Sequence, residues 1–263
     1  MILTVDVGNT NIVFGCTKPE NYETVFEERL VTDLRKTAIE YAITFKTILD
    51  LYKIKPEDIE GGILSSSVPP VTAQIKNGIE RLLGKSIIEV CPGIKTGVDI
   101  KLDDPSQLGP DLLVGAVAGL AQYGAPLILI DMGTATTISV ISKDRRFLGG
   151  MIIPGVRVAL EGLTTNAAHL PEIALEKPAK LIAGNTVGAM QSGSIFGQAC
   201  CVDGMIDRIW EDLGYETAVV ASGGFAGTVI PNCKHKITVD AELLPKGLTI
   251  LYEKNAKHSR KQN

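Results

Sequence analysis

Two similar acidic turns in the sequence contain the residue types that bind phosphate and cations. One is Asp6-Val7-Gly8-Asn9-Thr10-Asn11, and the other is Asp131-Met132-Gly133-Thr134-Ala135-Thr136. In each turn, glycine lets the backbone approach an anion closely, and consecutive N–H groups can form a concave set of donors. The side chains that would add donors are Asn9, Thr10, Thr134 and Thr136. A carboxylate repels phosphate, so each aspartate implies a cation, Mg²⁺ or a monovalent ion, between the two groups.

One such turn alone has a simpler explanation, a hairpin whose aspartate bonds to its own backbone. Two copies favour phosphate binding, because each follows a short apolar strand pattern, at residues 2–5 and 127–130. One turn in each half of the chain would let two domains hold a triphosphate from opposite sides.

A third turn, Ser222-Gly223-Gly224, follows a strand pattern and precedes a helix pattern. Without a Cβ at two positions, an adenosine could lie flat against this backbone. An ordinary strand-to-helix turn is the simpler explanation for this motif taken alone. Other nucleotide motifs are missing, since no GxGxxG occurs and the segment from Gly78 to Ser86 has the wrong spacing for a P-loop.

Asp111 follows Gly109-Pro110 at the start of a predicted helix. Helix capping explains its presence, because an acidic residue in the first turn interacts favourably with the helix dipole. A carboxylate there could equally act as the general base that takes the proton of an alcohol attacking a γ-phosphate. The sequence leaves these two roles open.

The elements that position these residues form a repeated α/β pattern. Each acidic turn joins two apolar segments that could pair as a hairpin. Strand patterns ending at Ser65 and at Ser222 are a second feature that the two halves share. Apolar spacing and terminal glycines predict helices over 33–52, capped by Asp33, and over 71–83 and 111–123, and one or two long helices over 186–213. Strands that alternate with helices indicate two similar α/β domains with mixed sheets facing a cleft.

The composition excludes several classes of protein. Hydrophobic residues make up 45% and charged residues 21% of 263 residues, which excludes a disordered chain. The net charge of −4 gives no basic field for nucleic acid, and the basic run 254–261 is typical of a solvated terminus. Five cysteines without metal-ligand spacing, and no signal or membrane-spanning pattern, favour reduced thiols in a cytoplasmic protein.

Taken together, the motifs resemble those of type III pantothenate kinases, a family of the actin-like, sugar-kinase-like ATPase superfamily. Besides the turns above, the resemblance rests on Ser66-Ser67-Val68-Pro69-Pro70 and on Gly149-Gly150-x-Ile152-x-Pro154-Gly155. Their order and spacing extend over nearly the whole chain. The DxGTAxT and GGxIxPG segments together are specific within the superfamily, whereas DxGNT alone indicates only the superfamily.

The resemblance implies two duplicated ribonuclease-H-like (actin-like ATPase) domains, with mixed sheets flanking a nucleotide cleft. The domains would be residues 1–110 and 111–263, with an insert around 149–186. The implied activity is ATP-dependent phosphorylation of pantothenate at its primary hydroxyl, the first step of coenzyme A biosynthesis. The implied enzyme is a cytoplasmic homodimer with its substrate pocket at the interface, and it needs Mg²⁺ and a monovalent cation, K⁺ or NH₄⁺.

The resemblance also implies a role for each matching residue. Asp111 would be the proton acceptor, Asp131 would bind the monovalent cation, and Asp6 would bind Mg²⁺ directly or through water. The implied ATP contacts are Asp6, Val7, Gly8, Asn9, Thr10, Asn11, Ile12, Val13, Thr134, Gly223 and Gly224. The implied pantothenate contacts are Gly109, Pro110, Asp111, Leu112 and Thr186.

Two positions depart from the family pattern. Many members have arginine after the catalytic aspartate and a further aspartate after the TAxT segment, where this chain has Leu112 and Ser139. Arg157 is a candidate replacement for the missing cation. The lost arginine also leaves open a nucleotide-binding regulatory protein of the same fold without transfer activity. A kinase of sugars or acetate is a third alternative, for which the chain is short.

Overall fold

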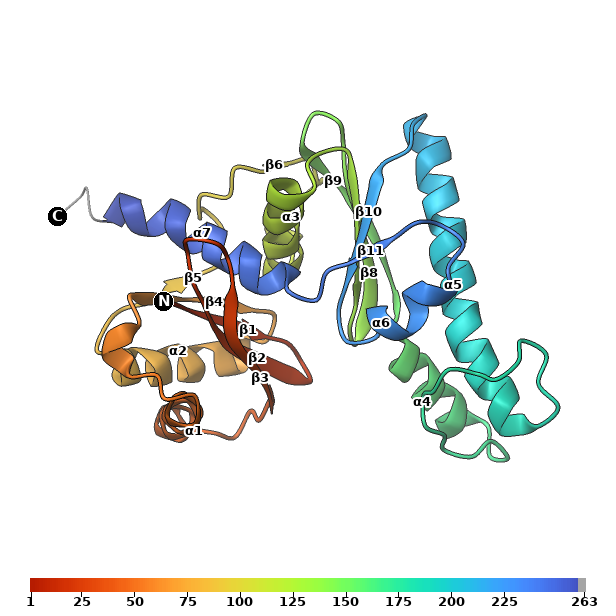
Figure 1. Ribbon diagram of the computed structural model, residues 1–263, viewed down its shortest axis with the longest axis horizontal. Coiled ribbons are helices and arrows are strands. Elements are labelled where there is room, and N and C mark those ends of the chain that lie inside the picture. Colours follow the sequence, from red (N-terminus) through yellow and green to blue (C-terminus); the bar gives the residue numbers. More distant parts are fainter. Residues whose placement is uncertain (260–263) are drawn as a thin grey trace. The chain divides into compact units, whose positions relative to one another are not determined.

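The computed structural model describes the backbone of residues 1–259 and the side chains of residues 1–256 (Figure 1). The chain divides into two compact units that interleave along the sequence. The first unit comprises Met1–Val98, Asp103–Ala121 and the described part of Glu242–Asn263, and the second comprises Asp99–Leu102 and Gln122–Ala241. The domain boundary after residue 110 stays a prediction. The basic run 254–261 lies partly outside the described residues.

The first unit contains a five-stranded mixed sheet in the order β3-β2-β1-β4-β5. The strands are β1 Ile2–Val7, β2 Asn11–Thr17, β3 Thr24–Val31, β4 Gly61–Ser66 and β5 Ile88–Glu89. The predicted hairpin is confirmed, because β1 and β2 pair antiparallel, while β4 runs parallel to β1 on its other side.

Helices cover both faces of this sheet. Helices α1 Ala38–Leu51 and α2 Pro69–Leu83 lie on one face and α7 Leu243–Ser259 on the other, and α3 Pro110–Gln122 is the remaining helix of the unit. Side chains from α1 and α2 pack with alternate residues of β1, Leu3, Val5 and Val7, in one apolar core. The rings of Phe14 and Phe45 stack in this core with centroids 4.4 Å apart. Asp6 alternates with the core residues, so it lies on the opposite face of the sheet.

The helix α7 packs on that opposite face and also against α3. Its Thr249 hydroxyl bonds to that of Thr17 on β2. A Cβ added at Gly61 of β4 would collide with the hydroxyl of Tyr252. At Gly247, a Cβ would collide with the carbonyl oxygen of Val114, so α7 and α3 touch backbone to backbone.

The second unit contains a six-stranded sheet in the order β11-β10-β7-β8-β9-β6. The strands are β6 Asp99–Ile100, β7 Leu127–Met132, β8 Ala135–Ile141, β9 Arg146–Pro154, β10 Ala218–Ser222 and β11 Thr238–Val239, and the helices are α4 Val156–Asn166, α5 Thr186–Leu213 and α6 Ala226–Val229. The long helix α5 packs on one face of this sheet through Ile195, Val202 and Ile206. Asp131 lies on the other face, because Ile130 and Met132 point into the core.

The two sheets repeat the same strand arrangement. Strands β1, β2, β3, β4 and β5 correspond to β7, β8, β9, β10 and β11, respectively, in their neighbours and in their directions. In the first sheet Asp6 lies opposite Ser65, and in the second Asp131 lies opposite Ser222. The shared feature predicted from the sequence is therefore a repeated strand register.

The acidic turns differ in length. Between the paired residues Val7 and Ile12 there are four residues, whereas between Met132 and Thr136 there are three. Val13 lies opposite Asp6, and Thr137 lies opposite Asp131. Equivalent residues of the two halves are 125 positions apart before the turn (Asp6 and Asp131) and 124 apart after it (Val13 and Thr137).

The predicted helices are present, with one wrong boundary. The first was expected to begin after Asp33, but α1 begins at Ala38. The N–H of Thr37 donates to Glu40 Oε2 at 2.8 Å, as in a capping box, whereas Asp33 accepts from the N–H of Arg35 in a preceding turn. Gly84 and Gly214 end α2 and α5 in the left-handed conformation. Among the described helices, none combines the length and apolar character needed to cross a bilayer.

The close contact between α7 and α3 yields a stability prediction. Gly247→Ala should lower the free energy of unfolding by about 1–3 kcal/mol, because the added methyl group must push the α3 backbone away. Gly162→Ala, within α4, is the matched control. No heavy atom lies within 4 Å of its added Cβ, so this change should raise stability by about 0.5–1 kcal/mol. Urea unfolding of both variants checks this, and equal stability of the two would contradict the packing described.

Candidate functional site

The first acidic turn is fixed by backbone hydrogen bonds. The N–H of Gly8 donates to the carbonyl oxygen of Asn11 at 2.9 Å. After β3, the hydroxyl of Thr32 donates to the carbonyl oxygen of Gly8 at 2.7 Å, and its N–H donates to that of Thr10 at 3.0 Å. The turn is therefore held in one shape while its side chains Asn9, Thr10 and Asn11 are exposed.

The sequence-predicted residues of this loop divide into two groups. The exposed amide and hydroxyl side chains can reach a ligand. The side chains of Val7 and Ile12 are fully buried in the core, so these residues can take part only through their backbone. Asp6, Gly8 and Val13 are half-buried.

Ser65 is a residue of this region that the sequence reasoning did not assign to the site. Its side chain is fully buried, and its hydroxyl has no hydrogen-bond partner among the described residues. It lies opposite Asp6 on the neighbouring parallel strand, so both side chains are on the same face. The match between Ser65 and Ser222 in the two halves was the available signal.

Three turns meet at Asp131 in the second unit. Asp131 Oδ1 accepts a hydrogen bond from the Ser222 hydroxyl at 3.3 Å. Gly223 has φ of +91°, and a Cβ there would lie 2.6 Å from the same carboxylate oxygen. Gly155 donates its N–H to the carbonyl oxygen of Thr134 at 3.0 Å, and a Cβ there would collide with that oxygen. Glycine is therefore required at both positions, and the turns that carry Asp131, Thr134 and Gly223 lie against one another.

The remaining residues of these turns differ in exposure. Thr134 and Gly224 are exposed, so both can meet a ligand. Thr136 was expected to add a donor, but its side chain is fully buried. This expectation is wrong because Thr137 is the residue that lies opposite Asp131, which turns Thr136 toward the other face.

Asp111 lies in the first turn of α3 and is half-buried. A Cβ added at Gly109 would lie 2.5 Å from Asp111 Oδ1, so the carboxylate folds back over this glycine. Pro110 occupies the first helical position, where its missing N–H is not needed. The sequence Gly-Pro-Asp therefore starts the helix and leaves room for the carboxylate at its amino end.

A cavity of about 740 Å³ lies in the second unit between α4 and the first half of α5. All its lining residues are uncharged: Val156, Ala159, Leu160, Leu163, Leu170, Ala183, Gly184, Asn185, Thr186, Ala189, Met190, Gly193, Ser194, Gly197 and Gln198. The predicted contact Thr186 belongs to this cavity, whereas the predicted contacts from Gly109 to Leu112 belong to the first unit.

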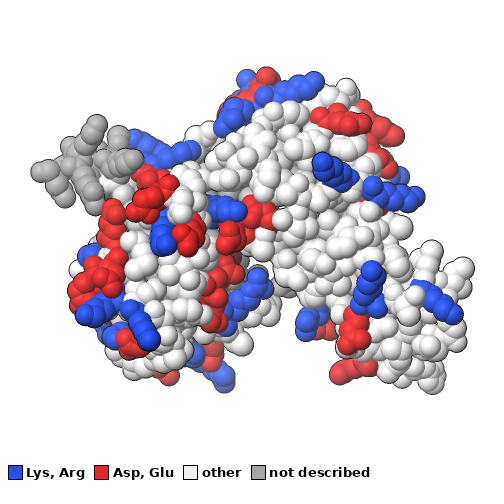
Figure 2. All heavy atoms as spheres, in the orientation of Figure 1, with Lys and Arg blue, Asp and Glu red and all other residues white. Residues whose placement is uncertain are grey.

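Charge and metal-binding groups around the turns are sparse. Within residues 1–256, no three acidic, histidine or cysteine side chains cluster as metal ligands. A lone carboxylate suits a cation that shares its ligands with phosphate oxygens and water, which is the usual arrangement for Mg²⁺. On the faces shown in Figure 2, acidic and basic side chains are interspersed over the surface of the first unit.

Two of the five cysteines, Cys16 and Cys233, are held as unreactive thiols. All five are free thiols. Burial raises the pKa of the Cys16 thiol to about 12, and burial together with the nearby Asp203 charge raises that of Cys233 to about 12. Thiols with such pKa values are protonated near neutral pH and are poor nucleophiles.

Comparisons with known proteins give the family. A family model described as type III pantothenate kinase matches residues 2–208. A type III pantothenate kinase from an Exiguobacterium species, strain AT1b, is 42% identical over 257 residues, spanning 98% of this chain and 100% of the relative. Another, from Exiguobacterium sibiricum, is 43% identical over 256 residues, spanning 97% and 100%.

Solved structures share the fold at low sequence identity. A ROK family glucokinase from Streptomyces griseus, in complex with glucose and AMPPNP, matches with a TM-score of 0.53 and 13% identity over 97% of this chain and 99% of that chain. A ROK family protein from Streptococcus pneumoniae, in complex with sucrose, matches with a TM-score of 0.55 and 11% identity over 100% and 99%. With the actin-like and sugar-kinase-like fold, the family model and full-length relatives all in agreement, the chain belongs to the type III pantothenate kinase family.

Proposed function

We infer that this chain transfers the γ-phosphoryl group of ATP to pantothenate in coenzyme A biosynthesis, and we propose the residues that do so. Family membership supports the activity. The observation that carries the residue assignment is the repeated register, in which a strand-end aspartate faces a serine and precedes a glycine turn in both sheets. Such a pair of turns, one in each duplicated domain, would let a kinase bind the phosphates of ATP from two sides.

We assign the phosphate contacts to the two acidic turns. In the first, Asn9, Thr10 and Asn11 supply exposed donors beside the N–H groups of the turn. In the second, Thr134 supplies its hydroxyl, and Gly223 and Gly224 provide a backbone surface for adenosine. The two sets belong to different compact units, and their convergence on one triphosphate is part of the proposal.

The residues at the turns fit two cations. Asp6 would hold Mg²⁺, directly or through water, and Asp131 would hold K⁺ or NH₄⁺ beside the Ser222 hydroxyl. When bound, these ions neutralise negative charge on the phosphate oxygens.

We assign Asp111 as the general base. Its carboxylate accepts the proton of the primary hydroxyl of pantothenate while the hydroxyl oxygen forms a bond to the γ-phosphorus. The bond from that phosphorus to the bridging oxygen breaks, and ADP leaves with the electron pair. Room for the carboxylate at the amino end of α3, provided by Gly109, supports this role.

The cavity between α4 and α5 supports a binding place for the apolar part of pantothenate. The exposed apolar side chains around the cavity support contact with a second subunit. Thr186 belongs to the cavity, and its walls carry no charge. Large apolar side chains around it are exposed: Leu163 46%, Leu181 66%, Ile182 87% and Val187 43%. Exposed apolar surface of this kind is typical of an interface, which favours the homodimer.

Asp111→Asn should greatly slow turnover with the structure retained. The amide keeps the size of the side chain but cannot accept the proton, so kcat should fall by about 10²–10⁴-fold. A coupled assay of ADP release with pantothenate measures this, and calorimetry should show that ADP binding is retained. Asp104→Asn, in the loop before α3, is the matched control. A near-normal rate for Asp111→Asn would remove the general-base assignment.

Turnover should depend on the monovalent cation through Asp131. The unmodified protein should show a higher kcat/KM for ATP in K⁺ than in Na⁺, because the smaller Na⁺ ion holds its hydration shell more tightly and costs more free energy to dehydrate. Asp131→Asn should lose this difference, whereas Asp144→Asn, at an exposed position in the same unit, should keep it. If Asp131→Asn responded to the two ions as the unmodified protein does, the cation site would have to lie elsewhere.

The dimer proposal predicts the effect of a charge on the apolar surface. The unmodified protein should sediment at about twice the mass of the 28.0 kDa chain. Ile182→Asp should shift it toward the monomer and raise KM for pantothenate, because a desolvated charge opposes association. Leu51→Asp changes a similarly exposed residue of the first unit and should leave the mass unchanged. A monomeric unmodified protein with full activity would contradict the proposal.

A further inference from the structure

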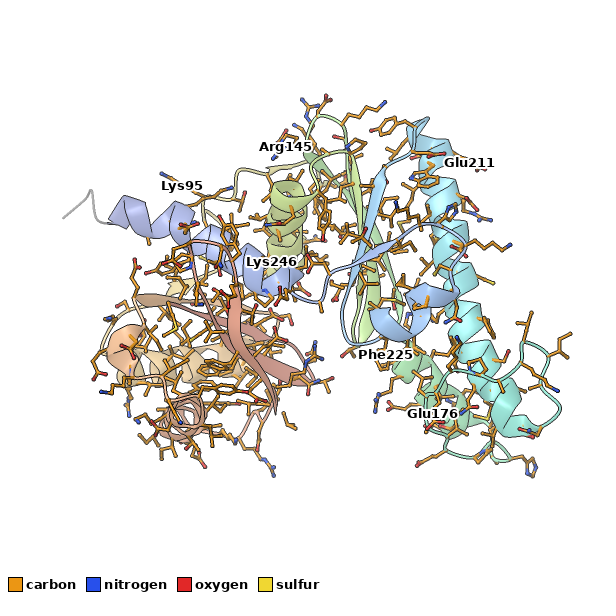
Figure 3. All side chains as sticks on the ribbon, viewed as in Figure 1. Lys95, Arg145, Glu176, Glu211, Phe225 and Lys246 are labelled. Atoms are coloured by element: carbon orange, nitrogen blue, oxygen red, sulfur yellow. The ribbon has the colours of Figure 1, made fainter. Side chains whose placement is uncertain are left out.

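Arg157 lies in the first turn of α4, two residues after the glycine that touches the Asp131 turn. Its guanidinium carbon is 5.6 Å from the centroid of the Phe225 ring. Phe225 follows Gly224, and its N–H donates to the carbonyl oxygen of Met132 at 3.2 Å. Figure 3 labels Phe225 at the place where α6 and the start of α4 meet. The Arg157 guanidinium therefore lies over the Phe225 ring, next to the turns that surround Asp131.

Apart from Arg157, the residues of these turns carry either a negative charge or none. In the segments 131–134, 154–157 and 222–225, the charged residues are Asp131 and Arg157. A polyphosphate placed against the exposed Thr134 hydroxyl would meet one carboxylate, which repels it, and one guanidinium, which attracts it. Arg157 is thus the side chain at this group of turns that can offset phosphate charge.

The conformation of Arg157 fits an incoming anion. Glu161 lies one helical turn further on, at the spacing of helix ion pairs. Arg157 nevertheless stacks on Phe225, is exposed, and has no ion-pair partner among the side chains that the structure describes. A guanidinium stacked on a ring keeps the N–H groups at its edge available for a phosphate.

We propose that Arg157 binds the phosphate chain of the nucleotide, and that Phe225 holds its guanidinium beside the glycine turn. The inference rests on the proposed nucleotide site. The sequence suggested Arg157 as a substitute for the arginine missing at position 112. Its contact with Phe225 instead assigns it to the nucleotide, on the side of the Ser222-Gly223-Gly224 turn.

Calorimetry with two ligands tests this assignment. Arg157→Ala should weaken binding of Mg²⁺–ADP by about tenfold, which corresponds to about 1.4 kcal/mol, and should leave adenosine binding unchanged. Arg157→Lys should show a smaller loss, because the charge remains but the planar group does not. KM for ATP should rise with the ADP dissociation constant, while KM for pantothenate stays the same.

Arg208→Ala is the matched control, since it removes an equal charge from an exposed position of α5 in the same unit. It should bind ADP as the unmodified protein does. Unchanged ADP binding by Arg157→Ala would overturn the assignment, and so would an equal loss for ADP and adenosine, which would indicate a role at the base. If the unmodified protein bound no ADP, the proposed nucleotide site itself would fail, and this inference with it.

Discussion

The close packing of two glycine turns against the turn that carries Asp131 is the constraint on which the second half of this protein depends. Asp131 ends a central strand, and the turns that carry Gly223 and Gly155 come so close to its turn that neither position can accept a Cβ. This contact forms only when the strand order places β10 beside β7 and when the residues before α4 and after β10 lie against the Asp131 turn. The surface around Asp131 therefore consists largely of closely packed backbone.

The same constraint explains why the duplication is visible in the register more than in the sequence. Asp6 and Asp131 each lie opposite a serine of the next parallel strand and on the face away from the main apolar core. A shift of one residue in either strand would bury the carboxylate among apolar side chains, at a large cost in free energy. Local sequence around these positions can diverge, but the alternation along the strands cannot.

Much of the fold could be predicted from the sequence, because its signals are local. Apolar alternation, glycine turns and helix-ending glycines determine the hairpins and most helix boundaries. The beginning of α1 was mispredicted, since either Asp33 or Thr37 could have capped the helix and only the reach of Glu40 decides between them. The burial of Thr136 was missed because the second turn is one residue shorter than the first. Contacts such as that of Arg157 with Phe225 depend on how the start of α4 packs against the turn between β10 and α6, which no local pattern encodes.

The unequal length of the two acidic turns has a consequence for how the protein can evolve. The longer turn presents three exposed side chains, Asn9, Thr10 and Asn11, whereas the shorter presents Thr134 and otherwise backbone. Single substitutions at the first turn therefore change the exposed surface without displacing the backbone. At the second turn, comparable adjustment requires displacement of main chain that is locked by glycine contacts. The first loop therefore tolerates side-chain replacement sterically, whereas the second tolerates little change at Gly155 and Gly223.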